Sequence, residues 1–158
     1  MAWCSGLGGS LAEGLGISRS LAVQVGGQPV ARYYSPVQIG TSSWSQVSTS
    51  NNHIAATLTT GALYAWGQNI SGQLGQGDTI YRSSPTIVGS SSWSVISAGS
   101  SYSMGITTNG LLFAWGYNGY GQLGTSNTTY YSSPVQIGTS LWTQVAGGWF
   151  HSLAIRTD

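Results

Sequence analysis

The chain has 158 residues, of which 41% are hydrophobic, and this is enough for a globular domain with its own core. Only 4% of the residues are charged, none is lysine, and the formal net charge is +1. Nucleic acids and anionic membranes both attract clusters of Lys and Arg, so this composition argues against either of them as a partner.

A repeat with a spacing of 49 residues organises most of the chain, and self-similarity of this kind is the signature of repeat architectures. The landmarks that keep this spacing are Pro36, Pro85 and Pro134; Trp44, Trp93 and Trp142; Trp66 and Trp115; Gly72 and Gly121; and Gly75 and Gly124. We expect them to be structural. The second pair of tryptophans would fill the space between neighbouring repeats, and the glycines would permit tight turns.

The first 40 residues carry the same landmarks at a different spacing. Trp3 precedes Trp66 by 63 residues, and Arg19 precedes Arg82 by the same number. This spacing exceeds the regular one by 14 residues, which indicates an insertion near residues 26–35. Residues 1–40 are therefore predicted to supply the last two strands of a repeat unit.

Each complete repeat contains four short apolar runs separated by Gly, Ser, Asn and Pro. In the repeat that begins at residue 90, the runs are 93–98, 102–107, 111–115 and 134–137. The second and third runs are joined by Asn109-Gly110, a strong hairpin signal because both residues tolerate positive φ. Pro134 opens the fourth run, and proline cannot donate to a strand ladder, so this run is predicted to lie at a sheet edge.

Four short strands in a repeat of this length predict an all-β fold made of β-propeller blades, each with four antiparallel strands. A solenoid or a stack of small sandwiches is the alternative. Residues 41–89 and 90–138 would each form one blade. Residues 139–158 would supply the first two strands of a further blade, whose last two strands come from residues 1–40. The whole chain, 1–158, is thus predicted to be a single domain with three blades' worth of strands, one blade being split between its two ends.

The repeat resembles that of the regulator of chromosome condensation family. The pattern Leu-aromatic-x-Trp-Gly-x-Asn-x-x-Gly-Gln-Leu-Gly is present at residues 63–75 and 112–124, and Val-Ala-Gly-Gly-x-x-His-Ser-Leu-Ala at 145–154. The resemblance implies a closed ring, commonly of seven blades, in which each blade begins at the centre and ends outside with the proline run. Family members include a nucleotide exchange factor that docks on nucleosomes, secreted inhibitors and scaffolds, so the resemblance implies no single function.

Three departures from the family pattern stand out. Ser50 replaces the glycine present at Gly99 and Gly148, Tyr102 replaces a histidine, and Cys4 replaces the glycine after a tryptophan. The exchange and chromatin roles would also use acidic and basic surface residues, which this chain nearly lacks.

Ring closure is the main functional expectation, because a ring of three blades would be too strongly curved. We expect head-to-tail self-association, in which the inner strands of one chain pair with the outer strands of a second copy. A homodimer would then close a ring of six blades, which is within the known range of propeller sizes. The alternative is that the chain is a fragment of a longer seven-bladed propeller.

The sequence contains no recognisable catalytic group, and we expect neither an enzyme nor a bound cofactor or metal. Glu13, Asp78 and Asp158 are the only acids and occupy unmatched repeat positions, which disfavours paired carboxylates. His53 and His151 occupy equivalent positions, which favours a structural or hydrogen-bonding role. Two histidines and one cysteine have no metal-ligand spacing.

A binding surface is expected at the loops that connect the strands, where propellers bind their partners. The predicted surface residues are His53, Tyr102, His151, Tyr117, Tyr120, Trp149 and Phe150, with Tyr33, Tyr34, Tyr81, Tyr130 and Tyr131 as further exposed aromatic candidates. Aromatic rings offer a large contact area to a partner protein or a sugar, although they could equally pack between blades. Two hypotheses follow: a protein-interaction and assembly module, or a carbohydrate-binding, lectin-like propeller.

Overall fold

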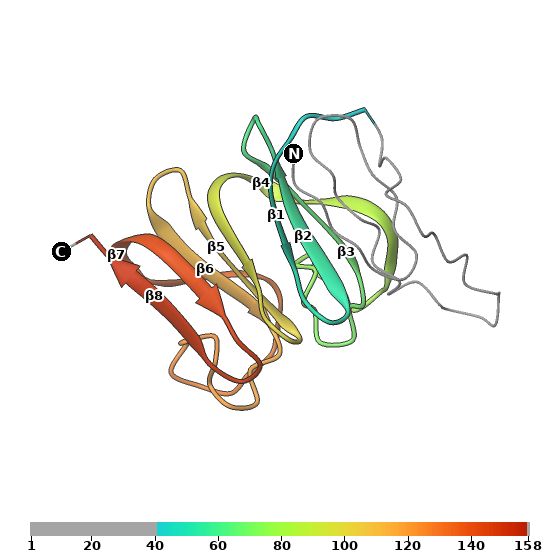
Figure 1. Ribbon diagram of the computed structural model, residues 1–158. Coiled ribbons are helices and arrows are strands. Elements are labelled where there is room, and N and C mark those ends of the chain that lie inside the picture. Colours follow the sequence, from blue (N-terminus) through green and yellow to red (C-terminus); the bar gives the residue numbers. More distant parts are fainter. Residues whose placement is uncertain (1–40, 158) are drawn as a thin grey trace.

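The computed structural model describes residues 41–157, and in this range it contains strands and no helix. Eight antiparallel strands follow one another in sheet order from β1 to β8 (Figure 1). They are β1 (Trp44–Thr49), β2 (His53–Leu58), β3 (Ala62–Gly67), β4 (Arg82–Ala98), β5 (Tyr102–Thr107), β6 (Leu111–Gly116), β7 (Tyr131–Gly147) and β8 (Ser152–Arg156). The predicted all-β fold of four-stranded antiparallel blades is confirmed.

Two long strands, β4 and β7, each belong to two blades. Residues 82–92 of β4 pair with β3, and residues 93–98 pair with β5. β7 repeats this arrangement, pairing first with β6 and then with β8. The described residues thus form a first blade (β1, β2, β3 and the start of β4), a second blade (the end of β4, β5, β6 and the start of β7) and a third strand pair (the end of β7 and β8).

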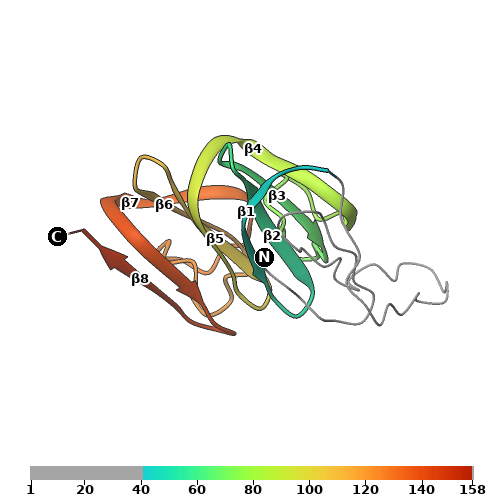
Figure 2. The ribbon, with the colours of Figure 1, turned by 45° about the horizontal axis from the view of Figure 1, so that its top comes forward.

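These units stand side by side along a curved arc (Figures 1 and 2). The strands predicted for residues 1–40 lie outside the described residues, and the blade boundaries at 41, 90 and 139 stay predictions.

A glycine turns each long strand from one blade into the next. Gly89 and Gly138 occupy equivalent positions in β4 and β7, with φ angles of 59° and 62°. Residues with a Cβ rarely adopt such left-handed values, whereas glycine does so without steric cost. One extended segment can therefore leave the outer edge of a blade and start the inner strand of the next.

The first strands of neighbouring blades lie against one another at the inner edge of the arc. The Ala98 backbone N–H donates to Ser48 Oγ at 2.9 Å. The Gly147 backbone N–H donates to Ser97 Oγ at the same distance, 49 residues further along. These repeat-related bonds join β1 to β4 and β4 to β7, so each blade begins at the centre.

The hydrophobic core lies between the blades. Trp115 is buried, and its ring centroid is 5.6 Å from that of Trp93. It belongs to a cluster that includes Leu63, Leu74 and Val88 of the first blade. This tryptophan therefore occupies the space between the two blades. Trp66, its equivalent in the first blade, is also buried, in a separate cluster with Trp44, Ile54 and Ala56.

The second contact between units repeats this arrangement with other side chains. Met104 and Ile106 of β5 pack against Trp142, Val145 and Ala154 of the third strand pair. One face of each blade thus covers the opposite face of the next.

Two glycines at equivalent repeat positions, Gly72 and Gly121, show how closely neighbouring blades approach each other. A Cβ at Gly72 would stand 2.5 Å from Ser132 Cα of the second blade, whereas at Gly121 the described structure places nothing within 4 Å. Both glycines have positive φ, 80° and 75°.

We expect Gly121→Ala to lower the free energy of unfolding by about 1 kcal/mol through backbone strain alone. Gly72→Ala should cost about 1–3 kcal/mol more through overpacking. Urea denaturation checks this difference, and equal losses from the two variants would contradict it.

Candidate interaction surfaces

The structure separates the predicted surface residues into two groups. Tyr120, Trp149, Phe150 and His151 are exposed and Tyr117 is partly buried. His53 and Tyr102, in contrast, are fully buried, so their assignment to a binding surface must be corrected. Both side chains point into the contact between neighbouring units, where they bond across it.

His53 lies in a hydrogen-bonded chain that joins the first two blades. Its Nε2 is 2.8 Å from Ser103 Oγ, and its Nδ1 is 2.7 Å from Ser50 Oγ. Ser103 donates its hydroxyl proton to the Gln73 carbonyl at 2.8 Å, so it must accept from His53 Nε2–H. Trp115 Nε1 donates to the same carbonyl at 3.0 Å. Burial lowers the pKa of His53 from its ordinary value of 6.5 to about 4, which keeps the ring neutral.

Ser50 explains one departure from the family pattern. Its hydroxyl bonds to the His53 ring, a role that the glycines at the equivalent positions cannot fill. At Gly99 a glycine is required for another reason, because a Cβ there would overlap the Tyr102 ring. The Tyr102 hydroxyl then reaches the His151 carbonyl of the third strand pair at 2.5 Å.

Loop 117–130, which follows β6, is held by the asparagine of the repeat pattern. Asn118 is buried, its Oδ1 accepts from Leu123 N–H at 2.9 Å, and its Nδ2 donates to the Asn127 carbonyl at 2.8 Å. Asn69 makes the equivalent bonds to Leu74 and Asp78 in loop 68–81. These bonds fix the loop that carries the exposed tyrosines.

Five rings form a continuous aromatic row on the face that carries these loops. The row consists of Tyr130, Tyr117, Tyr120, Phe150 and Trp149, in order of contact. Successive ring centroids are 4.7, 6.1, 4.7 and 5.9 Å apart. The row therefore crosses from the second blade to the turn between β7 and β8. The sequence identified all five residues as aromatic candidates, but their spacing along the chain does not reveal this contact order.

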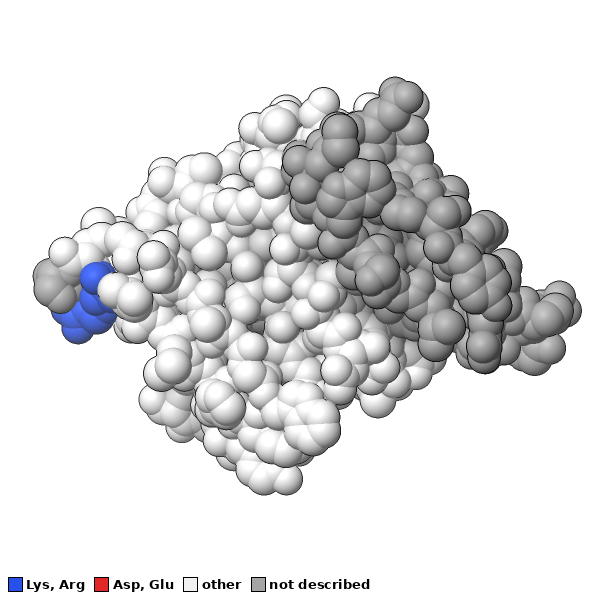
Figure 3. All heavy atoms as spheres, viewed as in Figure 1, with Lys and Arg blue, Asp and Glu red and all other residues white. Residues whose placement is uncertain are grey.

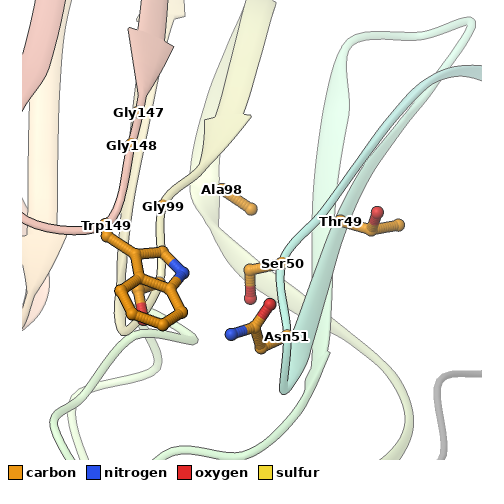
Figure 4. A pocket seen from close by; sticks show the side chains of 9 residues that line it. Thr49, Ser50, Asn51, Ala98, Gly99, Gly147, Gly148 and Trp149 are labelled. Atoms are coloured by element: carbon orange, nitrogen blue, oxygen red, sulfur yellow. The ribbon is translucent and has the colours of Figure 1, made fainter.

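A central cavity of about 200 Å³ lies where the three inner strands end. Its lining comes from repeat-related positions: Thr49, Ser50 and Asn51; Ala98, Gly99 and Ser100; and Gly147, Gly148 and Trp149. In Figure 4 the Trp149 ring stands on one side and the side chains of Ser50 and Asn51 on the other. The aromatic row thus ends at this cavity. Sequence reasoning missed the cavity, because its lining residues are small and polar and belong to three separate repeats.

The outer face of the third strand pair is apolar and exposed. Leu153 is 72% exposed and Ile155 is 56% exposed. The residues at the equivalent positions of the second blade, Met104 and Ile106, are buried. The positions that are buried between the second blade and the third strand pair are therefore open to solvent on β8.

Charged groups are rare on the described part of the molecule. Arg82, the first residue of β4, donates to Asp78 Oδ2 at 2.6 Å. The two residues form an ion pair where loop 68–81 meets β4. Hydrogen bonds from the Ile80 backbone and from Arg82 hold the pKa of Asp78 below its usual value. In the view of Figure 3, nearly all of the described surface is uncharged.

Within residues 41–157, no group of three or more His, Cys, Asp or Glu side chains could hold a metal ion. The same residues include no helix that could cross a membrane.

The repeated blades, with inner strands joined around a central cavity, define a β-propeller repeat protein. The family model of the regulator of chromosome condensation (RCC1) repeat matches residues 60–106 and 109–155. A second model with the same description matches residues 44–73 and 93–122. The first model alone covers more than half of the chain, which therefore belongs to the RCC1 repeat family, as its sequence motifs predicted.

Solved structures show the same fold at low sequence identity. Human WBSCR16 is 23% identical over 75% of this chain and 32% of its own, with a TM-score of 0.66. Prp20p from Saccharomyces cerevisiae, described with its binding to Gsp1p and histones, is 15% identical over 83% of this chain and 36% of its own, with a TM-score of 0.70. Yeast RCC1 (Prp20) bound to Kap60 is 23% identical over 77% and 29%, with a TM-score of 0.67.

The chain thus spans about a third of the length of these proteins. No curated protein matches it significantly. Family and fold together indicate a protein-interaction module.

Proposed function

We propose that the chain is a non-enzymatic interaction module whose exposed β7–β8 face binds a further propeller blade, supplied by a second copy of the chain. The observation that carries this proposal is the contrast between β5 and β8. Met104 and Ile106 are buried under the next unit, whereas Leu153 and Ile155, one repeat later, are exposed. Burying large apolar side chains of this kind stabilises a contact by about 1.5–3 kcal/mol each.

The proposed contact would rest on apolar burial more than on hydrogen bonds. Ser48 and Ser97 link the inner strands of neighbouring units. Ala146 stands at the next repeat position and has no hydroxyl. We therefore expect an association that depends on protein concentration.

The predicted geometry is head-to-tail, so that two chains close a ring of six blades. Residues 1–40 of the second copy would complete the third blade by adding its outer strands, as their repeat landmarks predict. These residues lie outside the described range, so the support for this geometry comes from the exposed face and the repeat register.

The non-enzymatic part of the proposal is supported by how the polar groups of the described residues are used. Asp78 is engaged by Arg82 and Asn69 within its loop. His53 lies in the bonded chain between blades, with no access to solvent. Asp78 and His53 are thus engaged within the fold, whereas His151 is exposed.

The test is the mass of the full chain in solution, measured by sedimentation at several concentrations. We expect a dimer that dissociates on dilution, and we expect Leu153→Asp/Ile155→Asp to give a folded monomer. The matched control is Ile70→Asp/Ile80→Asp, because Ile70 and Ile80 are exposed on loop 68–81, which connects β3 to β4 and is outside the β7–β8 face. This control should remain dimeric.

A folded monomer of the unmodified chain at every concentration would overturn the proposed self-association. It would favour the alternative that the open face is covered within a longer ring. Circular dichroism on all variants separates loss of association from loss of folding.

A further inference from the structure

We propose that the aromatic row and the central cavity together form a binding site for an uncharged oligosaccharide. The site is formed within one chain, so it does not depend on the proposed self-association. Its two parts meet at Trp149, which belongs to the row and lines the cavity.

The row offers the stacking surface that sugar rings need. Tyr120 is 66% exposed and Trp149 is 61% exposed, and about half of Tyr130 and of Phe150 is open to solvent. The C–H faces of a pyranose ring are apolar, and they stack on aromatic rings while the hydroxyls at the ring edge stay hydrated. Because the five rings contact one another in sequence, the row fits a chain of several sugar units better than a single one.

The cavity offers the complementary polar groups. Thr49 and Ser100 bring hydroxyls and Asn51 brings an amide, and groups of both kinds donate as well as accept hydrogen bonds. The Ser50 hydroxyl also lines the cavity, but it is already bonded to His53. Within the described residues, the side chains of Thr49 and Asn51 make no hydrogen bond of their own. An apolar wall with a few polar groups is the usual composition of a small-ligand site.

The chemistry of the site favours a sugar over a proline-rich peptide, the other ligand that aromatic surfaces bind. A proline-rich peptide presents carbonyl acceptors and few donors, so it would leave the acceptors of the cavity unused. Sugar hydroxyls satisfy donors and acceptors together. No charged side chain lines the cavity or belongs to the row, which fits an uncharged ligand.

The row is preorganised, which reduces the entropy lost on binding. The Tyr117 ring lies over Gly119, where a Cβ would overlap its hydroxyl. Asn118 holds the loop between them, as described above. The Tyr117 ring centroid lies 4.7 Å from that of Tyr130, and the Tyr130 hydroxyl raises the pKa of Tyr117 above its ordinary value.

The experiment measures binding of the full chain to short neutral oligomers of glucose, mannose, xylose and N-acetylglucosamine, by calorimetry and by the change in tryptophan fluorescence. We expect at least one oligomer to bind. Trp149→Ala and the double variant Tyr117→Ala/Tyr120→Ala should each weaken this binding about tenfold or more. Ile70→Ala is the matched control, since Ile70 is an exposed apolar residue outside the row, and it should bind as the unmodified chain does.

Three results would overturn the inference. One is that none of the neutral oligomers binds. Another is that a proline-rich peptide binds and the oligosaccharides do not. The third is that binding survives in both aromatic variants. Denaturation curves for each variant exclude loss of folding as the cause of lost binding, and sedimentation shows whether the oligomeric state has changed.

Discussion

Replacement of Trp115 by alanine is expected to lower the free energy of unfolding by about 3–5 kcal/mol, the usual cost of removing a large buried aromatic side chain. Trp115 is buried between the first two blades, in the cluster with Leu63, Leu74 and Val88. The variant also removes the Nε1–H donor to the Gln73 carbonyl. The loss should appear in urea denaturation followed by circular dichroism, since the substitution changes the fluorescence signal itself.

Two controls separate the apolar from the polar part of this effect. Trp115→Phe keeps most of the packing but loses the donor, so it should cost less than the alanine variant. Trp149→Ala removes an exposed tryptophan and should change stability by less than about 0.5 kcal/mol. If Trp115→Ala were as stable as Trp149→Ala, the blades would not depend on Trp115 for their contact.

The fold was predictable because the repeat holds tryptophans, prolines and glycines in one register. In the second blade, β5 and β6 agree with the apolar runs at 102–107 and 111–115 to within a residue. The run at 93–98 matches the part of β4 that pairs with β5. The fourth run, 134–137, was placed less well, because the strand that contains it continues beyond the apolar residues at both ends. β7 extends from residue 131 to 147 and passes through Gly138 into the next unit. A glycine in a sequence suggests a turn, but here it redirects a continuing strand.

The site was less predictable, because equivalent repeat positions do not have equivalent surroundings. His53 and His151 occupy equivalent positions two repeats apart, yet His53 is buried against Ser103 and His151 is exposed. Burial depends on whether another unit packs against the position, and a repeat alignment does not contain that information. The same reasoning applies to Met104 of β5 and Leu153 of β8, which occupy equivalent positions, because only Met104 is covered by a further unit.

The contacts between units therefore carry both the stability and the proposed activity of this chain. Each unit contributes one covered face and one covering face, and the described residues end on the face of β8 that nothing covers. Variants of the contact between the first two blades change folding, whereas variants on β8 should change association. Variants of the aromatic row should change a third property, ligand binding, because its rings are exposed and add little to either contact.

The stability of the protein is expected to fall by about 3 kcal/mol as the pH is lowered from above 6.5 to 4, because of His53. Burial lowers its pKa to about 4, against about 6.5 in the unfolded chain. Between these values the unfolded state binds a proton that the folded state does not, so unfolding becomes more favourable as pH falls. The stabilisation is complete above pH 6.5 and lost by pH 4. Urea denaturation at a series of pH values measures the slope directly.

The variant His53→Gln should be less stable at neutral pH, since it disturbs the bonds to Ser50 and Ser103, but its stability should vary little between pH 6.5 and 4.5. His151→Gln, at the equivalent exposed position, should keep the slope of the unmodified chain. Asp78 cannot produce the slope, because its pKa is lowered and its titration falls below this window. A His53→Gln variant that retained the full pH dependence would show that another group is responsible, and that the chain from Ser50 to Gln73 does not hold a neutral imidazole.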